Sequence, residues 1–122
     1  MNNKRIGMEF ENEMLEKLSR KGWWVHFINP DNSGAQPFDL IAVKNGTAIA
    51  ADCKTCKSKM FSVSRLEYNQ VMAFNKWLAC GNECPIIFVK HNDEVYLIPF
   101  TDLISKGKVR ISDFPSWEQS NL

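Results

Sequence analysis

This 122-residue sequence has no long apolar run. No stretch reaches the roughly 18 apolar residues that a membrane-spanning helix needs, which excludes an integral helical membrane protein. The opening residues also lack the apolar segment of a signal peptide, since they read MNNKRIGMEFENE. We therefore expect a cytoplasmic protein whose cysteine thiols are reduced.

The sequence also has little net charge and little histidine. Fifteen basic residues nearly balance fourteen acidic ones, and a net charge of +1 says little about partners. The two histidines, His26 and His91, are isolated from each other, which disfavours a histidine-based site. Hydrophobic residues make up 44% and charged residues 24%, as in ordinary soluble proteins, so we expect one domain over residues 1–122.

Basic residues gather in three short groups despite the balanced total. Such groups suit contacts with phosphates, but they also suit an ordinary solvated surface. The first group has no acidic residue within it. The groups are Lys54, Lys57, Lys59 and Arg65; Lys17, Arg20 and Lys21; and Lys106, Lys108 and Arg110.

Hydrophobic periodicity and turn signals predict a mixed domain of the α/β (α+β) class in the order αβββαββ. Asn45-Gly46 is a strong hairpin signal, and Ser64 with Glu67 has the form of a capping box. We expect a central mixed sheet of about five strands, flanked by helices. The predicted elements are a helix at 7–21, strands at 23–28, 38–44 and 47–55, a helix from 64 to about 80, strands at 85–90 and 94–99, and a short helix at 101–106.

The last residues differ in composition from the rest. The core is expected to cover about residues 7–104, and residues 107–122 form a polar tail. Phe114 and Trp117 are apolar anchors within this tail. We expect it to pack loosely or to add a short element.

Two aspartates fall together if the predicted hairpin keeps a regular register. A two-residue loop at 45–46 places Asp39 directly opposite Asp52. Their Cβ atoms would lie roughly 5 Å apart, where like charges are destabilising. A shared divalent cation would remove the repulsion, because Mg²⁺ binds carboxylate oxygens. A bulge that shifts the register, or a solvated end of the hairpin, would remove it as well.

Strand alternation predicts a lysine beside this pair. Asp52 and Lys54 share one face of their strand, and Cys53 points to the other. Ala48 and Ala50 continue the face of Asp52 and leave room beside the acid. The opposite face is apolar and consists of Ile49, Ala51 and Cys53.

Two polar residues fall on the apolar faces of the predicted helices. Glu11 lies within the apolar arc of the first helix and needs a partner, because a lone buried carboxylate is costly. Gln70 lies in the apolar row of the second helix, where it either faces a site or is a core amide satisfied by the backbone. The arc of the first helix comprises Met8, Phe10, Met14, Leu15 and Leu18, and its other glutamates, Glu9, Glu13 and Glu16, are predicted to face solvent.

Acids and a lysine that converge on a divalent metal often catalyse phosphodiester hydrolysis. The metal polarises a phosphoryl oxygen and lowers the pKa of a bound water. A neighbouring lysine can orient the nucleophile or stabilise the developing negative charge.

These residues resemble the PD-(D/E)XK nuclease superfamily. Its D-x-K element is similar to Asp52-Cys53-Lys54, and its upstream acid is similar to Asp39 in PFDLIAV. The first helix of the cellular Holliday junction resolvases, archaeal and RecU-type, resembles IGMEFENEMLEKLSRKGW, with Gly7 and Glu11 at the matching positions. Their hairpin, following helix and closing hairpin resemble FDLIAVKNGTAIAADCKTCK, LEYNQVMAF and NDEVYLIPF.

The resemblance implies a restriction-endonuclease-like core with a Mg²⁺ or Mn²⁺ site. The carboxylates of Asp39 and Asp52 and the carbonyl of Cys53 would be ligands, and Glu11 would complete the cluster through water or a second metal. Lys54 would position the attacking water or stabilise the charge. Two features depart from the pattern: the D/E position holds Asp rather than the Glu common in resolvases, and the chain is shorter than RecU-type proteins.

The resemblance also implies further residues and partners. Gln70 would support the lysine or the water, and the DNA-binding residues would be Lys57, Lys59, Arg65 and the loop serine Ser33. Resolvases of this kind are homodimers that nick two opposed strands of a four-way junction. We therefore expect a metal-dependent endodeoxyribonuclease that forms a homodimer and acts on branched DNA during recombination and repair, with no membrane partner.

Three other functions stay open from the sequence. A nuclease of the same fold could act on flaps, single strands or plain duplex, and a non-catalytic DNA-binding or protein-binding module could keep the fold. The cysteines allow a zinc-stabilised module, but Cys53 is predicted in mid-strand, whereas a zinc CxxC usually lies in a turn. Small, buried or half-buried apolar residues are the favoured interpretation of Cys53, Cys56, Cys80 and Cys84.

Overall fold

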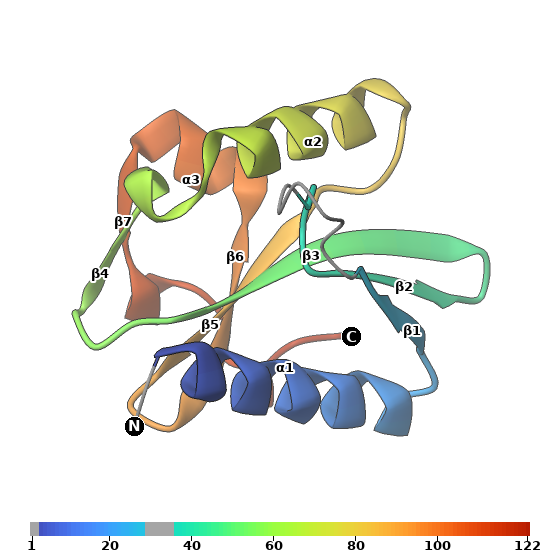
Figure 1. Cartoon of the computed structure of the whole chain (residues 1–122), viewed down its shortest axis with the longest axis horizontal. Coiled ribbons are helices and arrows are strands. Elements are labelled where there is room, and N and C mark those ends of the chain that lie inside the picture. Colours follow the sequence, from blue (N-terminus) through green and yellow to red (C-terminus); the bar gives the residue numbers. More distant parts are fainter. Residues whose placement is uncertain (1–2, 29–35) are drawn as a thin grey trace.

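The computed structural model describes residues 3–28 and 36–122, with side chains from Arg5 onward. Five strands form one mixed sheet in the order β1-β2-β3-β5-β6, in which β3 and β5 run parallel and the other neighbours antiparallel. The predicted fold class is confirmed (Figure 1). The elements are α1 (Asn3–Arg20), β1 (Trp24–Phe27), β2 (Leu40–Lys44), β3 (Thr47–Thr55), β4 (Met60–Ser62), η1 (Val63–Arg65), α2 (Tyr68–Ala79), β5 (Ile86–His91), β6 (Glu94–Pro99), α3 (Phe100–Lys106), β7 (Lys108–Arg110) and η2 (Ile111–Asp113).

The Asn45-Gly46 turn sets the register of β2 and β3 as the sequence predicts. Both residues have positive φ, 50° for Asn45 and 78° for Gly46, as a two-residue hairpin of type I′ requires. Lys44 pairs with Thr47, and the ladder runs regularly to Leu40 opposite Ala51.

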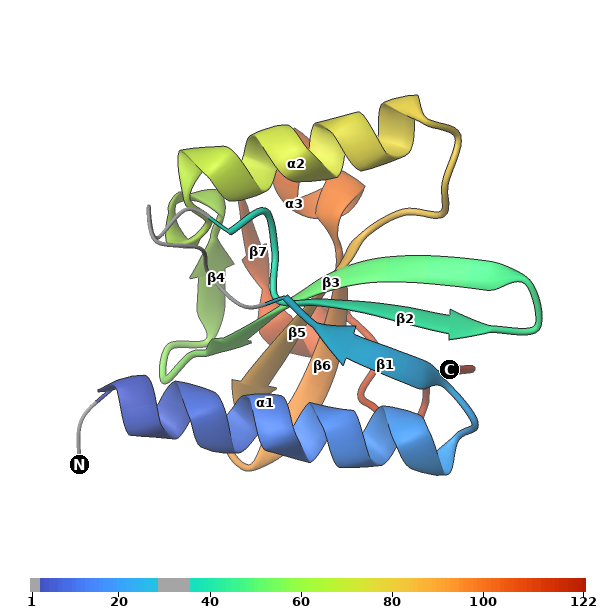
Figure 2. The same ribbon diagram turned by 45° about the vertical axis from the view of Figure 1, so that its right-hand side comes forward.

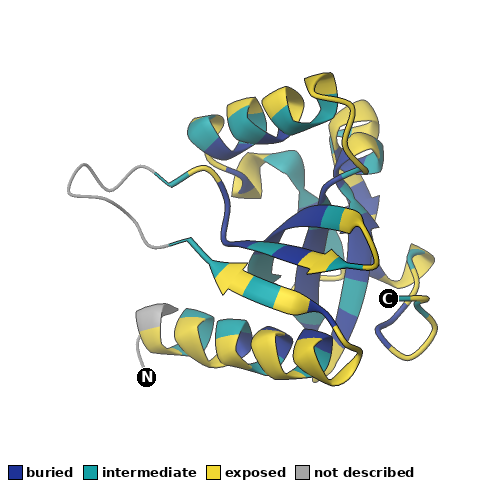
Figure 3. Cartoon of the chain, turned by 90° about the vertical axis from the view of Figure 1, so that its right-hand side faces the viewer, coloured by how far each residue is buried: buried dark blue, intermediate teal, exposed yellow. Residues whose placement is uncertain are grey.

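The sheet lies between two helical layers. Figures 1 and 2 show α1 on one face and α2 with α3 on the other. Strand alternation sends Ile49, Ala51 and Cys53 into the cluster under α1, and Ala50 into the cluster under α2. Figure 3 shows that buried residues concentrate on the strands between these layers. The α1 cluster includes Phe10, Met14, Leu18, Leu40 and Phe88, and the α2 cluster includes Phe61, Phe74, Ile87, Phe100 and Leu103.

The buried stripe of α1 is narrower than the predicted arc. Phe10, Met14 and Leu18 form the buried row, whereas Met8 is 54% and Leu15 is 38% exposed. Glu13 was predicted to face solvent, which is wrong, because the Lys90 ammonium on β5 lies 2.5 Å from its carboxylate. The apolar arc read from the sequence does not show which side of α1 packs against the sheet. In the structure, Glu13 lies at the border of the buried row, where it pairs with Lys90.

The C-terminal segment adds the short elements β7 and η2, which confirms one of the two expectations, and it belongs to the core, so the alternative of loose packing is wrong. β7 pairs with β4 in a separate two-stranded sheet. Trp117 is buried against Phe88, and its amide donates to the Val95 carbonyl at 2.7 Å. Of the predicted anchors, Trp117 is buried and Phe114 is partly buried. Within the described residues, no helix combines the length and apolarity needed to cross a membrane.

Candidate active site

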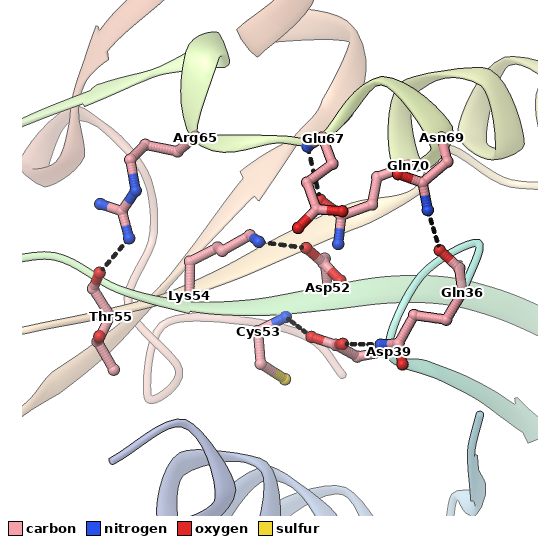
Figure 4. A network of polar contacts seen from close by, with 10 residues as sticks. All are labelled: Gln36, Asp39, Asp52, Cys53, Lys54, Thr55, Arg65, Glu67, Asn69 and Gln70. Atoms are coloured by element: carbon pink, nitrogen blue, oxygen red, sulfur yellow. Dashed lines mark hydrogen bonds and ion pairs between the residues drawn. The ribbon is translucent and has the colours of Figure 1, made fainter. Parts of the chain in front are cut away.

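Four of the predicted catalytic residues, Asp39, Asp52, Lys54 and Gln70, meet where the N-terminal end of α2 approaches the C-terminal half of β3 (Figure 4). Asp52 and Lys54 project from the same face of β3, as alternation predicts. Asp39 approaches β3 from the chain just before β2. Cys53 directs its sulfur away from Asp52 and Lys54.

Asp39 does not lie in the β2–β3 ladder, although the register itself is the predicted one. Its amide donates to the Ala51 carbonyl at 3.1 Å, and its side chain replaces the next ladder contact. The backbone N–H of Cys53 donates to Asp39 Oδ2 at 2.8 Å, and the side-chain Nε2 of Gln36 donates to Asp39 Oδ1 at 2.8 Å. Both oxygens thus accept a hydrogen bond, which fixes the position of the Asp39 carboxylate beside β3.

Asp52 has the opposite environment. The residue is fully buried, and neither carboxylate oxygen has a hydrogen-bond partner. The Lys54 ammonium lies 3.3 Å from Oδ2, outside hydrogen-bond geometry but within ion-pair distance. Burial, and secondarily the neighbouring charge of Asp39, raise the pKa of Asp52 to about 8, although Lys54 opposes the shift.

Burial and the negative charge of Asp39 raise the pKa of both Glu11 and Cys53. Partial burial, followed by the charge of Asp39, raises the pKa of Glu11. This places Glu11 near Asp39, on the α1 side of the sheet. Burial, with the charge of Asp39 next in size, also raises the pKa of the Cys53 thiol, so this sulfur stays protonated. A protonated thiol is a poor metal ligand, in keeping with its apolar surroundings.

Gln70 is buried, and it belongs to the cap of α2. Its side-chain oxygen accepts the Glu67 amide at 2.9 Å, while Glu67 caps the Gln70 amide in return. The predicted capping box at Ser64 and Glu67 is therefore wrong by one turn: Glu67 is the N-cap, and Ser64 lies in the preceding η1. The predicted backbone-satisfied amide is present, and the Gln70 nitrogen also points toward Asp52 and Lys54 (Figure 4).

Two residues of this network are absent from the predicted site. Gln36 holds Asp39, and the Asn69 amide in turn donates to the Gln36 carbonyl, which ties the start of β2 to α2. Gln36 stands in a polar loop three residues before Asp39, and this proximity is the only sequence signal for it. Asn69 has none, because it approaches Gln36 only through the docking of α2.

The predicted DNA-binding residues lie at different places. Arg65 donates to the Thr55 carbonyl at 2.9 Å, one residue beyond Lys54, and its guanidinium stands over the Phe61 ring. Lys57 and Lys59 are exposed in the segment between β3 and β4. Ser33 lies outside the described residues.

The buried Asp52 carboxylate, which accepts no hydrogen bond, suits a divalent metal. A buried carboxylate without any hydrogen-bond donor is costly, and a cation between Asp52 and Asp39 would satisfy it. The Cys53 carbonyl leaves the strand on the same edge as its amide, toward Asp39. Across residues 3–28 and 36–122, no three His, Cys, Asp or Glu side chains are close enough to share a metal. Asp39 and Asp52 are thus the carboxylates that lie together here, and Glu11 does not form a group of three with them.

Cys53 touches this site through its backbone, and the other three cysteines lie in different settings. All four are free. Cys56 is buried and Cys53 and Cys84 are half-buried, as favoured, whereas Cys80 is exposed, so that interpretation is wrong for Cys80. The Cys56 thiol contacts the carbonyls of Ser58 and Met60, and the Cys84 thiol contacts that of Pro85. These contacts are those of small side chains packed against the backbone.

Comparison with known proteins decides the family. The sequence profile of the archaeal Holliday junction resolvase (Hjc) family matches residues 2–114. This chain belongs to the archaeal Holliday junction resolvase family. The resemblance predicted from Glu11, Asp39 and the D-x-K element is confirmed, with the archaeal rather than the RecU-type branch as the match.

Two members of the family show how far the similarity reaches. The crossover junction endodeoxyribonuclease Hjc of Methanocaldococcus jannaschii is 28% identical over 110 residues, which cover 89% of this chain and 77% of that protein. The 1.6 Å structure of Hjc from the hyperthermophile Archaeoglobus fulgidus superposes with a TM-score of 0.69 at 20% identity, over 89% of this chain and 92% of the other. This second similarity establishes the shared fold.

Proposed function

We propose that this resolvase-family protein is a metal-dependent endodeoxyribonuclease that cleaves four-way DNA junctions. One observation carries the chemistry: a fully buried Asp52 carboxylate without hydrogen bonds, beside Asp39 and 3.3 Å from the Lys54 ammonium. Membership of the family supports the substrate, since its members are described as Holliday junction resolvases.

Each residue has a role that follows from its surroundings. Asp39, held in position by Gln36 and Cys53, and Asp52 would be the side-chain ligands of Mg²⁺ or Mn²⁺, with the Cys53 carbonyl as a further ligand. When bound, such an ion neutralises the two carboxylates and polarises the scissile phosphate.

Lys54 is the cation of the site. It is 19% exposed at its side chain, so its ammonium can reach a substrate oxygen or a water while staying beside Asp52. There it would orient the nucleophile and stabilise negative charge on the phosphate. The amide nitrogen of Gln70 would help to orient Lys54 or that water, and Glu11 would hold water on the α1 side.

Two opposed cuts require two sites, and each chain carries one. We propose that two copies act as a homodimer, each nicking one strand across the two-fold axis of the junction.

A plasmid that extrudes a cruciform tests the activity and the pairing together. With Mg²⁺ or Mn²⁺, paired nicks within one binding event yield linear DNA, whereas single nicks yield open circles. Asp52→Ala and Asp39→Ala should each lower the cleavage rate by at least about 100-fold, because the metal loses a ligand. Asp113→Ala, an exposed acid far along the chain in η2, is the matched control.

Two outcomes would reject the proposal. One is the absence of cleavage by the unaltered protein with any divalent metal; the other is unchanged cleavage by Asp52→Ala. Flaps, single strands and plain duplex, assayed beside the junction, identify any other preferred substrate.

A further inference from the structure

A cleft of about 310 Å³ lies away from the proposed catalytic residues, where the β4–β7 sheet meets the turn between β5 and β6. The side chains around it are polar or basic, and no carboxylate is among them. The lining residues are Lys59, His91, Asn92, Tyr96, Arg110 and Ser112.

The fold brings together two basic groups that are far apart in the sequence. Lys59 comes from the group that follows β3, and Arg110 ends the group near the C-terminus. Arg110 pairs with Met60 across the β4–β7 sheet, and the Ile111 amide donates to the Lys59 carbonyl at 2.9 Å. The pairing of β4 with β7 thus brings Lys59 and Arg110 to one cleft.

The positive charge of this pair is not neutralised within the described part of the chain. Neither Lys59 nor Arg110 makes an ion pair with a carboxylate there, whereas Lys17 and Lys90 both pair with Glu13. The adjoining cleft of about 350 Å³ is a weaker anion site, because its Lys90 is paired and Asp93 lines it. Unpaired cations facing an acid-free cleft attract an anion.

The other polar groups of the cleft are mostly engaged. His91 Nδ1 lies 2.9 Å from the Cys56 carbonyl, which can only accept, so Nδ1 carries the hydrogen. The Tyr96 hydroxyl donates to Glu94 at 3.1 Å. Glu94, Asp93 and Asp113 are close in sequence to lining residues, but none of them is part of the lining. The groups left to bind an anion are the Lys59 ammonium, the Arg110 guanidinium and the Ser112 hydroxyl.

We propose that this cleft binds a backbone phosphate of the DNA substrate, outside the catalytic centre. Arginine's planar fork and a lysine ammonium together suit a phosphodiester. The chain runs from Asp52 through Lys54 to Lys59 in seven residues, and Figure 1 shows β3 leading to β4 beside β7. DNA held at Asp52 and following this segment would reach β4 and β7. The inference rests on the proposed function and assigns a contact for a flanking part of the same substrate.

The salt dependence of binding tests this contact. Affinity for a labelled four-way junction is measured in EDTA, which prevents cleavage, over a range of salt concentrations. Arg110→Ala and Lys59→Ala should each weaken binding several-fold and lower the slope of log K against log salt by about one. Arg110→Lys and Lys59→Arg keep the charge and should keep the slope.

The matched control is Lys21→Ala, an exposed lysine just after the C-terminal end of α1, at the other end of that helix from β4 and β7 (Figure 1). Its slope should equal that of the unaltered protein. Equal slopes for Arg110→Ala and the unaltered protein would overturn the inference, as would a slope lowered equally by Arg110→Lys. If the unaltered protein neither binds nor cleaves the junction, the proposed function fails instead.

Discussion

Asp39 and Asp52 are neighbours with opposite surroundings. Asp39 accepts hydrogen bonds from Gln36 and the Cys53 amide, and Asp52 accepts none. The first carboxylate is therefore ready to bind a cation, whereas the second carries a strong penalty when it ionises without one. This difference couples metal binding to the protonation state of Asp52.

The coupling predicts how stability depends on pH without metal. The pKa of Asp52 is about 8 in the folded chain and near its ordinary value of about 3.9 when unfolded. The folded state therefore holds a proton that the unfolded state releases, and stability falls as pH rises from about 4 to 8. Asp52→Asn should remove this loss and raise the free energy of unfolding at pH 8 by on the order of 2 kcal/mol.

Urea unfolding in EDTA at pH 4 and pH 8 measures the effect. The gain from Asp52→Asn should be small at pH 4, and Mg²⁺ at pH 8 should stabilise the unaltered protein more than the variant. The exposed Asp113→Asn serves as the control. An equal gain for Asp52→Asn at both pH values would contradict the prediction.

At the scale of elements, the first turn of α2 has two roles. The reciprocal bonds between Glu67 and Gln70 satisfy amides that the helix cannot pair internally. The same turn carries Asn69, which holds Gln36, and Gln36 holds Asp39. The start of this helix thus contributes both to stability and to the position of a proposed metal ligand.

Removing one half of the cap should weaken the helix. Gln70→Ala leaves the Glu67 amide without its acceptor and should lower the free energy of unfolding by about 1–2 kcal/mol. Asn75→Ala, at an exposed position of the same helix, should change it by less than about 0.5 kcal/mol. Chemical denaturation measures both, and equal losses would show that the cap does not stabilise α2.

At the scale of the whole molecule, the C-terminal segment contacts both the small β4–β7 sheet and the α1 side of the main sheet. β7 completes the small sheet with β4, and Trp117 packs under the main sheet on the side of α1. The Trp23 indole and the Lys44 ammonium both donate to the carbonyl of Leu122, at 2.9 and 3.2 Å. The segment therefore closes the α1 cluster and also carries Arg110.

Substituting a buried and an exposed tryptophan tests how much the C-terminal segment contributes to the free energy of unfolding. Trp117 is 8% exposed, and Trp117→Ala should cost about 3–5 kcal/mol of unfolding free energy. Trp24 is 62% exposed and stacks on His26, so Trp24→Ala should cost about 1 kcal/mol or less. Thermal and denaturant unfolding of the two variants check this, and similar costs would mean that the C-terminal segment packs weakly.

Features that depend on residues close together in the chain could be predicted from the amino-acid sequence. Turn chemistry at Asn45-Gly46 sets the β2–β3 register, and alternation puts Asp52 and Lys54 on one face with Cys53 on the other. These are short-range effects, because a two-residue loop and the period of a strand leave few alternatives. The order of the larger elements was predictable for the same reason, whereas β4 and β7 were not predicted.

Contacts between residues far apart in the chain became apparent only in the folded structure. Asp39 leaves the ladder because its side chain takes the Cys53 amide, and the docking of α2 supplies Asn69 to hold Gln36. The cleft of Lys59 and Arg110 exists only because β4 pairs with β7 across some 50 residues. Local periodicity carries no information on such pairings, since they form only when whole elements bury their apolar faces together.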